Sequence, residues 1–246
     1  MPTGRNLGYG RAANLGIARV RSEEVLVCNP DVVLDVGALG ALSRVLAEEP
    51  DCAVVGPRID NPDGTRYPSA RSFPSLTVAA GHALLGPFAP ANRWSRRYHS
   101  GGGLSSQGGP AGGSTSGTGG GEVFEADWVS GACFLARTSA LRSVGGFDEG
   151  YFMYAEDVDL CWRLRRAGWR VCYAPAARVV HHQGLSTSRH PYRMLVAHHR
   201  SAWRFARVST SGPSRALLPL VAVALAGRLA VLLAREMARR GVPGKS

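Results

Sequence analysis

The 246-residue sequence lacks several features that mark common protein classes. Its five cysteines lie far apart and form no C-x-x-C pair, so no structural zinc site is visible, and we expect buried, reduced thiols of a cytosolic protein. Residues 1–6 contain no apolar run of a signal peptide, so export of the main domain is not expected. No basic run carries the aromatic residues or zinc spacing of a nucleic-acid module, which argues against nucleic acid as a partner.

Acidic residues are also scarce. The chain has 18 Asp and Glu against 29 Lys and Arg, which gives a net charge of +11 and an isoelectric point near 10.2. The basic residues are nearly all arginine and concentrate after residue 160. This balance favours an anionic partner such as a phospholipid surface or a diphosphate substrate. A hydrophobic content of 45% is ordinary for a globular core, so the chain is not disordered throughout.

The first 190 residues alternate between strand and helix patterns, which predicts an α/β layer structure. Short apolar runs typical of buried strands cover residues 25–28, 53–56, 128–136, 171–173 and 178–180. Helical spacing or helix-end signals mark residues 39–46, 139–144 and 156–166. Asp35 could cap the first of these helices, and Gly168 could stop the last.

Two segments differ from this pattern in composition. Residues 100–121 are nearly all Gly, Ser, Thr, Pro and Gln, which is typical of a flexible surface loop. Residues 191–207 form an arginine-rich amphipathic helix candidate, and the apolar stretch 216–234 follows, interrupted by Pro219 and Arg228. An interfacial membrane helix fits this stretch better than a span, and a helix packed against the domain remains the alternative.

Three carboxylates follow an aromatic turn at residues 151–154. Glu156, Asp157 and Asp159 could simply mark the start of a helix, where the helix dipole and the unpaired amides stabilise acidic side chains. The apolar residues leading into them also indicate partial burial, which would suit a carboxylate for proton transfer. Both interpretations are compatible.

Two further polar groups follow strand candidates: Asn29-Pro30-Asp31 after the first, and His181-His182 after the last. In open α/β sheets such ends converge on one crevice, so these groups and the acidic helix start could share a divalent ion and a phosphate-bearing ligand. Taken singly, Asp31 is more typical of a turn, and His181 of a hydrogen-bonded histidine.

In order and spacing, these elements resemble the inverting family 2 glycosyltransferases of the GT-A fold. The resemblance runs from Asn6 to about Arg207 and implies a Rossmann-like mixed sheet flanked by helices. The matching elements are residues 6–10 with Asn14 and Gly16, 29–31, 128–132, 145–149, 156–159 and 181–184.

The resemblance also implies roles for individual residues. Asp157 occupies the position of the family's general base, and Glu156 and Asp159 would position the acceptor or the base. Asp31 would bind Mg²⁺ or Mn²⁺ that bridges to a sugar-nucleotide diphosphate. His181 would complete the metal site, and His182 is the alternative residue for that role. The residues implied in donor or acceptor binding are Asn6, Gly8, Asn14, Asn29, Trp128, Gly131 and Ala132.

A second set of residues resembles the actinobacterial rhamnosyltransferases of cell-wall linker synthesis: 67–71 with 74–76, 82 with 85–88, 151–154 and 197–201. This implies dTDP-rhamnose as donor, a polyprenyl-diphospho-N-acetylglucosamine acceptor, and a cytoplasmic enzyme at the inner face of the plasma membrane, held by an anionic membrane surface. A galactofuranosyl or hexosyl transferase on the same scaffold is the alternative specificity. A non-catalytic remnant that binds membrane is the alternative class.

The resemblance departs from the family pattern at the beginning of the chain. Family members have a strand, a helix and a second strand before the Asn-x-Gly-Tyr element, which here starts at Asn6. We therefore expect a GT-A domain over residues 1–190 that is missing its first strands and part of its donor pocket. Membrane-associated amphipathic and apolar helices are expected over residues 191–240.

Overall fold

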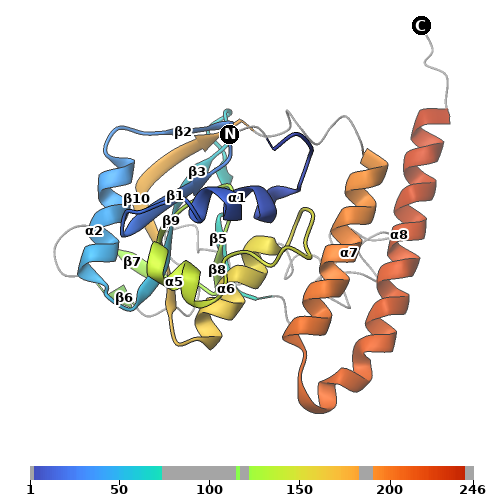
Figure 1. The fold of residues 1–246 in the computed structure, drawn as a ribbon. Helices are drawn as coiled ribbons and strands as arrows, with labels where there is room; N and C mark the ends of the chain where they lie inside the picture. The colour runs from blue at the N-terminus through green and yellow to red at the C-terminus, as the bar shows by residue number, and fades with distance from the viewer. Residues whose placement is uncertain (1–2, 74–114, 117–121, 183–190, 242–246) are drawn as a thin grey trace, which may run out of the picture. The chain divides into compact units, whose positions relative to one another are not determined.

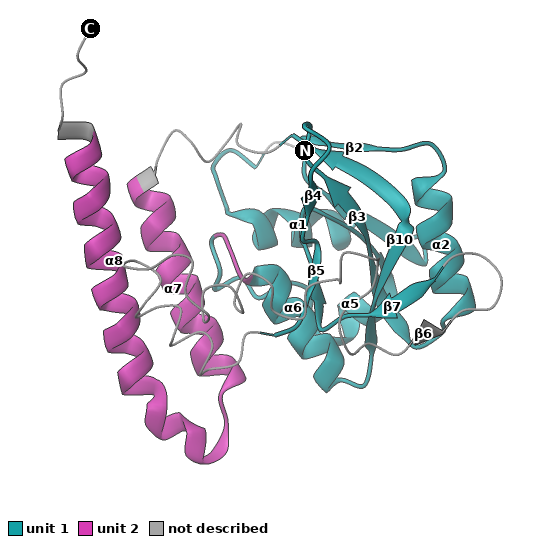
Figure 2. Cartoon of the chain, turned by 180° about the vertical axis from the view of Figure 1, so that it is seen from behind, with its two compact units in different colours: residues 1–73, 100–152, 156–185 teal, residues 74–99, 153–155, 186–246 magenta. Residues whose placement is uncertain are grey.

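The computed structural model describes residues 3–73, 115–116, 122–182 and 191–241 (Figure 1). The chain divides into two compact units (Figure 2). Unit 1 comprises residues 1–73, 100–152 and 156–185, and unit 2 comprises residues 74–99, 153–155 and 186–246. The expected flexible loop at residues 100–121 lies outside the described residues, apart from the short strand β6, Thr115–Ser116.

Unit 1 is built on a mixed sheet of eight strands, which runs in the order β1-β9-β3-β10-β7-β6, with β2 paired to β10 and β4 paired to β3. The central pair, β3 and β10, is parallel, and the other pairs are antiparallel. A separate two-stranded ribbon joins β5 to β8. The remaining strands are β1 Glu24–Cys28, β2 Val32–Leu34, β3 Cys52–Asp60, β4 Arg66–Tyr67, β5 Ala70–Arg71, β7 Val123–Glu125, β8 Trp128–Val129, β9 Cys133–Arg137 and β10 Arg170–His181.

Helices cover both faces of this sheet, because neighbouring residues of each central strand point to opposite sides. Val55 and Leu135 pack with helix α2, Ala38–Glu48, which buries Leu42 and Leu46 completely. Val54 instead belongs to the cluster on the other face, which includes residues from α1 Tyr9–Ile17, α5 Thr138–Ser143 and α6 Glu156–Arg166. The expected α/β class, a mixed sheet flanked by helices, is confirmed.

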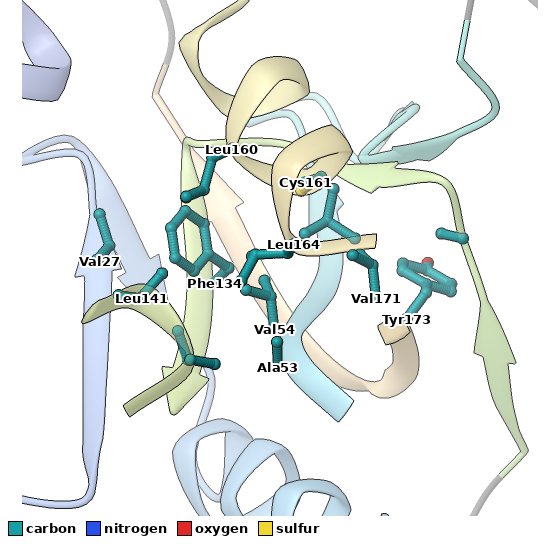
Figure 3. Packing of buried hydrophobic residues seen from close by; sticks show 14 of the residues in the cluster. Val27, Ala53, Val54, Phe134, Leu141, Leu160, Cys161, Leu164, Val171 and Tyr173 are labelled. Atoms are coloured by element: carbon teal, nitrogen blue, oxygen red, sulfur yellow. The ribbon is translucent and has the colours of Figure 1, made fainter. Parts of the chain in front are cut away.

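The packing of α6 fixes the helix that begins with the acidic residues. Leu160 and Leu164 lie one turn apart and point from α6 toward the sheet, where they meet Phe134 and Val54 (Figure 3). Both leucines are 0% exposed, so each contributes roughly 1.5–3 kcal/mol of hydrophobic burial. The start of α6 is therefore anchored on a rigid core.

Three local expectations differ from the structure. The apolar stretch 128–136 is not one strand, because residues 130–132 turn between β8 and β9. Residues 171–173 and 178–180 are one strand, β10, with an irregularity in register between Ala174 and Arg178. Asp35 does not cap α2 with its side chain: Gly37 is the N-cap, and Asp35 only accepts the Ala38 amide through its backbone carbonyl.

The five cysteines are all free thiols, as expected from their spacing. Four are buried, and burial raises the pKa of Cys133 and of Cys161 to about 12. Cys28, at the end of β1, is exposed, so the expectation that all five are buried is wrong for this residue.

Unit 2 contains α7, Pro191–Ser209, the short 3₁₀ helix η1, Gly212–Leu217, and α8, Leu218–Gly241. The amphipathic helix expected over residues 191–207 is therefore present. The segment Gly212–Arg239 is long and apolar enough to cross a membrane by length and composition. A stretch of 18 residues within it has a mean hydropathy of 2.3, and 6% of that stretch is buried. Large apolar side chains of α8 are exposed, including Leu220, Val223 and Met237.

Candidate active site

Asp157 lies in the first turn of α6 with both carboxylate oxygens held by backbone amides. The Gly131 N–H donates to Oδ2 at 2.8 Å, and the Val158 N–H donates to Oδ1 at 2.9 Å. Burial raises the pKa of Asp157, and these two hydrogen bonds together with the positive charge of Arg71 oppose that rise. Each oxygen keeps a second lone pair, so the fixed carboxylate can still accept a proton from a bound hydroxyl group.

Gly131 allows the main chain to approach Asp157 this closely. A Cβ atom at residue 131 would lie 3.2 Å from the Asp157 Cβ atom and 3.4 Å from its Oδ2 atom. On its other side, the Gly131 carbonyl accepts a hydrogen bond from the Tyr9 hydroxyl. Burial and the negative charges of Asp157 and Glu156 raise the pKa of Tyr9, which keeps the phenol protonated as a donor.

Glu156 is buried, and its Oε2 atom has no hydrogen-bond partner among the residues that the structure describes. Burial, followed by the charge of Asp157, raises the pKa of Glu156 from 4.5 to about 8. Two adjacent carboxylates in such a site cannot both ionise easily, so one tends to keep its proton at neutral pH. No described residue donates a hydrogen bond that would stabilise a charge on Glu156 Oε2, so this geometry favours Glu156 as the neutral partner.

This carboxyl group should make folding stability depend on pH. Between 4.5 and about 8 the folded chain holds a proton on Glu156 that the unfolded chain releases, so stability should fall as pH rises through this window. The slope for one such group is at most about 1.4 kcal/mol per pH unit. Glu156→Gln should flatten this slope, as measured by urea unfolding at several pH values. The exposed Glu23→Gln control should retain it, and an equal effect of both variants would contradict the assignment.

Asp159, expected to help position the acceptor or the base, is fully buried and held by its own neighbours. Its Oδ2 atom accepts a hydrogen bond from Arg163 Nε at 2.7 Å, one helical turn away, and its Oδ1 atom accepts one from the Tyr151 hydroxyl at 3.3 Å. Burial raises the pKa of Asp159, and Arg163 opposes this. These contacts favour a structural role, in which Asp159 joins α6 to the aromatic turn before it.

A second polar cluster lies at the end of β10. The His181 Nε2 atom is 3.1 Å from Asp31 Oδ1 and 3.2 Å from Asn29 Nδ2. Residues 29 and 31 are brought there by the turn between β1 and β2, and β2 pairs antiparallel with β10 so that Val32 lies opposite His181. The His182 side chain is exposed, and the His182 amide donates to the Asp31 carbonyl at 2.9 Å. The structure therefore joins Asn29, Asp31 and His181.

The turn between β8 and β9 connects this cluster to Asp157. Gly131 donates its amide hydrogen to Asp157, and the next residue, Ala132, accepts the Asn29 amide at its carbonyl oxygen with a distance of 2.8 Å. Neighbouring residues of one turn thus contact both acidic clusters. The residue that the sequence suggested for the base and those suggested for the metal are thus linked through the backbone of Gly131 and Ala132.

The donor atoms of the second cluster suit a divalent ion in part. Asp31 Oδ1 and His181 Nε2, which lie 3.1 Å apart, are a carboxylate oxygen and an imidazole nitrogen, atoms that could bind Mg²⁺ or Mn²⁺. The described part of the chain contains no group of three or more His, Cys, Asp or Glu side chains arranged around one ion. Two protein ligands completed by substrate phosphates and water are a common arrangement for Mg²⁺.

The other residues expected to bind donor or acceptor have visible local roles. Asn14 Oδ1 accepts the Phe147 amide at 2.9 Å, and Asn14 Nδ2 donates to the Phe147 carbonyl at 2.9 Å, so this side chain fixes the turn after α5. Gly8 has a φ of 84°, and a Cβ atom there would collide with the Phe152 carbonyl oxygen. The exposed Asn6 accepts the Gly8 amide at 3.0 Å.

The two residues directly before Glu156 have a strained backbone. Tyr154 and Ala155 have φ angles of 70° and 62°, in the left-handed region that non-glycine residues rarely adopt. Within unit 2, the Ser201 hydroxyl of α7 donates to the Met153 carbonyl at 2.8 Å, and the His198 ring packs edge-on against Tyr154 at 5.4 Å between centroids. These contacts hold the turn that leads into the acidic residues.

Three features of unit 1 were not foreseen from the sequence. One is the hydroxyl contact of Tyr9, although this residue lies inside a motif that pointed to the site. Another is buried Asp60, which pairs with Arg58 at 2.9 Å and with Arg178 at 3.0 Å. A third is Arg71, stacked on aromatic rings. Each of these three contacts depends on sheet pairing or on turns, and the local periodicity of the sequence does not indicate such contacts.

Comparison with known proteins identifies the class that this fold and site define. Residues 1–117 match the family described as "Glycosyl transferase family 2", and residues 118–206 match "Glycosyltransferase like family 2". The chain belongs to the family 2 glycosyltransferases, enzymes that transfer a sugar to an acceptor. The resemblance noted in the sequence is thereby confirmed.

Particular relatives narrow the comparison. The chain is 42% identical to N-acetylglucosaminyl-diphospho-decaprenol L-rhamnosyltransferase of Mycobacterium tuberculosis, over 98% of this chain and 76% of that protein. It is 52% identical over 56 residues to rhamnosyltransferase WbbL of Escherichia coli, which covers 23% of this chain and 21% of that protein. It is 22% identical to the low-salt glycan biosynthesis hexosyltransferase Agl10 of Haloferax volcanii, over 76% of this chain and 52% of that protein.

A solved structure supports the fold assignment. The crystal structure of GalNAc-T7 with UDP, GalNAc and Mn²⁺ superposes with a TM-score of 0.51 at 13% sequence identity. The match covers 76% of this chain and 32% of the other, so the chain spans about a third of that protein. At this identity the likeness shows a shared GT-A-like fold.

Proposed function

We propose that this chain transfers L-rhamnose from dTDP-rhamnose to a polyprenyl-diphospho-N-acetylglucosamine acceptor in a single inverting displacement. The identity of 42% over nearly the whole chain to a transferase named for this reaction supports the substrates. The observation that carries the chemistry is the Asp157 carboxylate, held by two backbone amides at the start of α6.

The proposed mechanism assigns one task to each cluster. Asp157 takes the proton from an acceptor hydroxyl as its oxygen attacks the anomeric carbon, and dTDP leaves from the opposite face. Asp31 and His181 would hold a divalent ion, either Mg²⁺ or Mn²⁺, which offsets the negative charge of the departing diphosphate. Gly131 orients the base, and the Tyr9 hydroxyl orients the Gly131 peptide.

Unit 2 supports a membrane location for the proposed reaction, because a polyprenyl acceptor is embedded in lipid. The segment Gly212–Arg239 is apolar, and Leu220 and Val223 expose 67% and 71% of their surface. An exposed apolar helix in a chain with a net charge of +11 suits an anionic bilayer. We place the enzyme on the cytoplasmic side of the plasma membrane, where nucleotide sugars are available.

The test is incubation of the purified chain with dTDP-L-rhamnose, Mg²⁺ or Mn²⁺, and a short-chain polyprenyl-diphospho-N-acetylglucosamine. We expect mass spectrometry to show addition of one deoxyhexose, and NMR to show inverted anomeric configuration. Turnover with UDP-galactofuranose or UDP-glucose alone would instead support a different sugar specificity. Retained liposome binding without donor binding would support a non-catalytic membrane-binding role.

A further inference from the structure

Arg71 is held between two aromatic side chains of unit 1. Its guanidinium carbon lies 5.4 Å from the centroid of the Trp128 ring and 5.8 Å from that of the Tyr67 ring. Arg71 pairs with Trp128 across the β5–β8 ribbon. The Arg71 Nε atom donates to the Pro68 carbonyl at 2.9 Å, and Trp128 Nε1 donates to the Ser72 carbonyl at 3.1 Å. The side chain is thus fixed in one orientation.

This fixed guanidinium forms no salt bridge with a carboxylate group of the described residues. Its one hydrogen bond there is the Nε contact with Pro68, so both terminal nitrogens keep donors for another group. Most other arginines of the sheet and of α6 that lie partly buried are paired; Arg163 and Arg165, for example, each bind a carboxylate at 2.7 Å. A partly buried arginine with ordered stacking and free terminal donors suits a planar or tetrahedral anion.

The strand that carries Trp128 leads directly to the base. Two residues after β8, the Gly131 amide binds Asp157, and one residue after β8 the Ser130 amide donates to the Ser69 carbonyl at 2.8 Å. Burial raises the pKa of Asp157, and the positive charge of Arg71 is one of the smaller influences that oppose this rise. Arg71 therefore belongs to the surroundings of Asp157, whereas the Asp31–His181 pair lies at the end of β10.

This placement distinguishes the two diphosphates of the proposed reaction. In an inverting displacement the base faces the acceptor hydroxyl, on the side of the sugar opposite the leaving diphosphate. An anion-binding group beside the base is therefore suited to a phosphate carried by the acceptor. The acceptor of the proposed function carries a diphosphate on the same sugar ring that presents its hydroxyl.

We propose that Arg71 binds the diphosphate of the acceptor, with Trp128 and Tyr67 fixing its guanidinium; this rests on the function proposed above. The guanidinium donates two parallel N–H bonds to phosphate oxygens, which sets the acceptor hydroxyl at Asp157. Arg71 is a specificity-determining residue that separates a lipid-diphosphate acceptor from a neutral glycoside.

The test compares two acceptors with Arg71→Gln, Arg71→Lys and wild type. One acceptor is a short-chain prenyl-diphospho-N-acetylglucosamine, and the other is neutral octyl N-acetylglucosaminide. We expect Arg71→Gln to raise the KM of the diphosphate acceptor about 10- to 100-fold, the loss of a charge-assisted bidentate contact. For Arg71→Gln, the KM values for the neutral acceptor and for dTDP-rhamnose should stay within about twofold of wild type. Arg71→Lys should have an intermediate KM for the diphosphate acceptor. The control Arg44→Gln, at an exposed residue, should have the same KM values as wild type.

Several outcomes would overturn the role of Arg71. An equal rise in KM for both acceptors would indicate general damage, and a rise for the donor alone would place Arg71 in the donor site. Weaker binding of Arg71→Gln to phosphatidylglycerol vesicles, with an unchanged acceptor KM, would assign the charge to lipid headgroups instead.

Direct binding keeps this test separate from that of the proposed function. The prenyl-diphospho acceptor is titrated by calorimetry against wild type and Arg71→Gln without donor. Binding weakened about 10- to 100-fold in the variant supports the assignment even if rhamnose is not the sugar transferred, and unchanged binding contradicts it. Rhamnose transfer by wild type with unaltered acceptor binding by Arg71→Gln would leave the function standing and remove Arg71 from it.

Discussion

Replacing Asp157 with asparagine should lower kcat by about 10²- to 10⁴-fold, the range typical of a lost general base. Asparagine has nearly the same volume, but its amide cannot take the proton of an acceptor hydroxyl at neutral pH. Donor binding should remain close to wild type, because Asp31 and His181 lie in a separate cluster. Steady-state kinetics and a titration with dTDP give the two quantities.

The control for this variant must account for local hydrogen bonds. Both oxygens of Asp157 accept backbone amides, so an asparagine loses at least one of the contacts with Gly131 and Val158. Asp159→Asn is the matched variant in the same turn, since it weakens the contact with Arg163. We expect Asp159→Asn to lower the thermal midpoint of unfolding and to leave kcat much closer to wild type than Asp157→Asn does. Near-normal turnover by Asp157→Asn would remove Asp157 from the role of base.

The pH profile adds a second signature of the same residue. A base must be deprotonated to act, so kcat/KM should rise with pH through the pKa of Asp157, which burial raises above its ordinary value of 3.8. Because Glu156 and Asp157 are neighbours, the acid limb belongs to the pair and not to one residue. Because Glu156 keeps its proton up to a pKa of about 8, Glu156→Gln should leave this limb nearly in place, since glutamine resembles the protonated side chain.

The outline of the fold was accessible from sequence because burial leaves a periodic trace. The apolar run at residues 25–28 and the helical spacing of Leu42 and Leu46 correspond to β1 and α2. The apolar stretch 128–136 shows the limit of this trace. Gly131 and Ala132 are as buried as the strands on either side, so composition alone does not reveal the turn that places them beside Asp157 and Asn29.

The two acidic clusters differ in how far the sequence could specify them. Asp31 follows β1 and His181 is the last residue of β10, so their meeting could be foreseen from the tendency of strand ends to converge. The close approach of Gly131 to Asp157 is possible because glycine has no side chain. The contacts of Arg71 with the aromatic rings depend on the short ribbon formed by β5 and β8. Neither has a periodic signal, because each is decided by tertiary packing.

The separation of the clusters has a chemical consequence. A displacement at one carbon needs negative charge neutralised on one side and a proton removed on the other. The turn at Gly131 and Ala132 contacts both clusters through backbone groups, whose positions do not depend on side-chain rotamers. Substitutions in one cluster should therefore affect donor binding and turnover differently.

Replacing Asp31 with alanine should weaken metal-dependent donor binding at least about tenfold, which corresponds to about 1.4 kcal/mol. The variant removes the carboxylate that lies 3.1 Å from His181 Nε2, so a divalent ion between protein and diphosphate would lose one of two protein ligands. His181→Ala should act in the same direction. The measurement is calorimetric titration of dTDP in the presence of Mn²⁺, repeated with EDTA.

The neighbouring histidines provide a matched control. The His181 side chain contacts the side chains of Asp31 and Asn29, whereas the His182 side chain is exposed and His182 contacts Asp31 through its backbone amide. His182→Ala should therefore bind dTDP with Mn²⁺ as tightly as wild type. With EDTA the wild type and the Asp31 and His181 variants should bind dTDP with similar, weak affinity, since the ion no longer distinguishes them. Two results would contradict this assignment: a full Mn²⁺-dependent gain in affinity in Asp31→Ala, or loss of that gain in His182→Ala but not in His181→Ala. Either result would mean that other residues hold the ion, and that Asp31 and His181 do not form the donor-binding cluster proposed here.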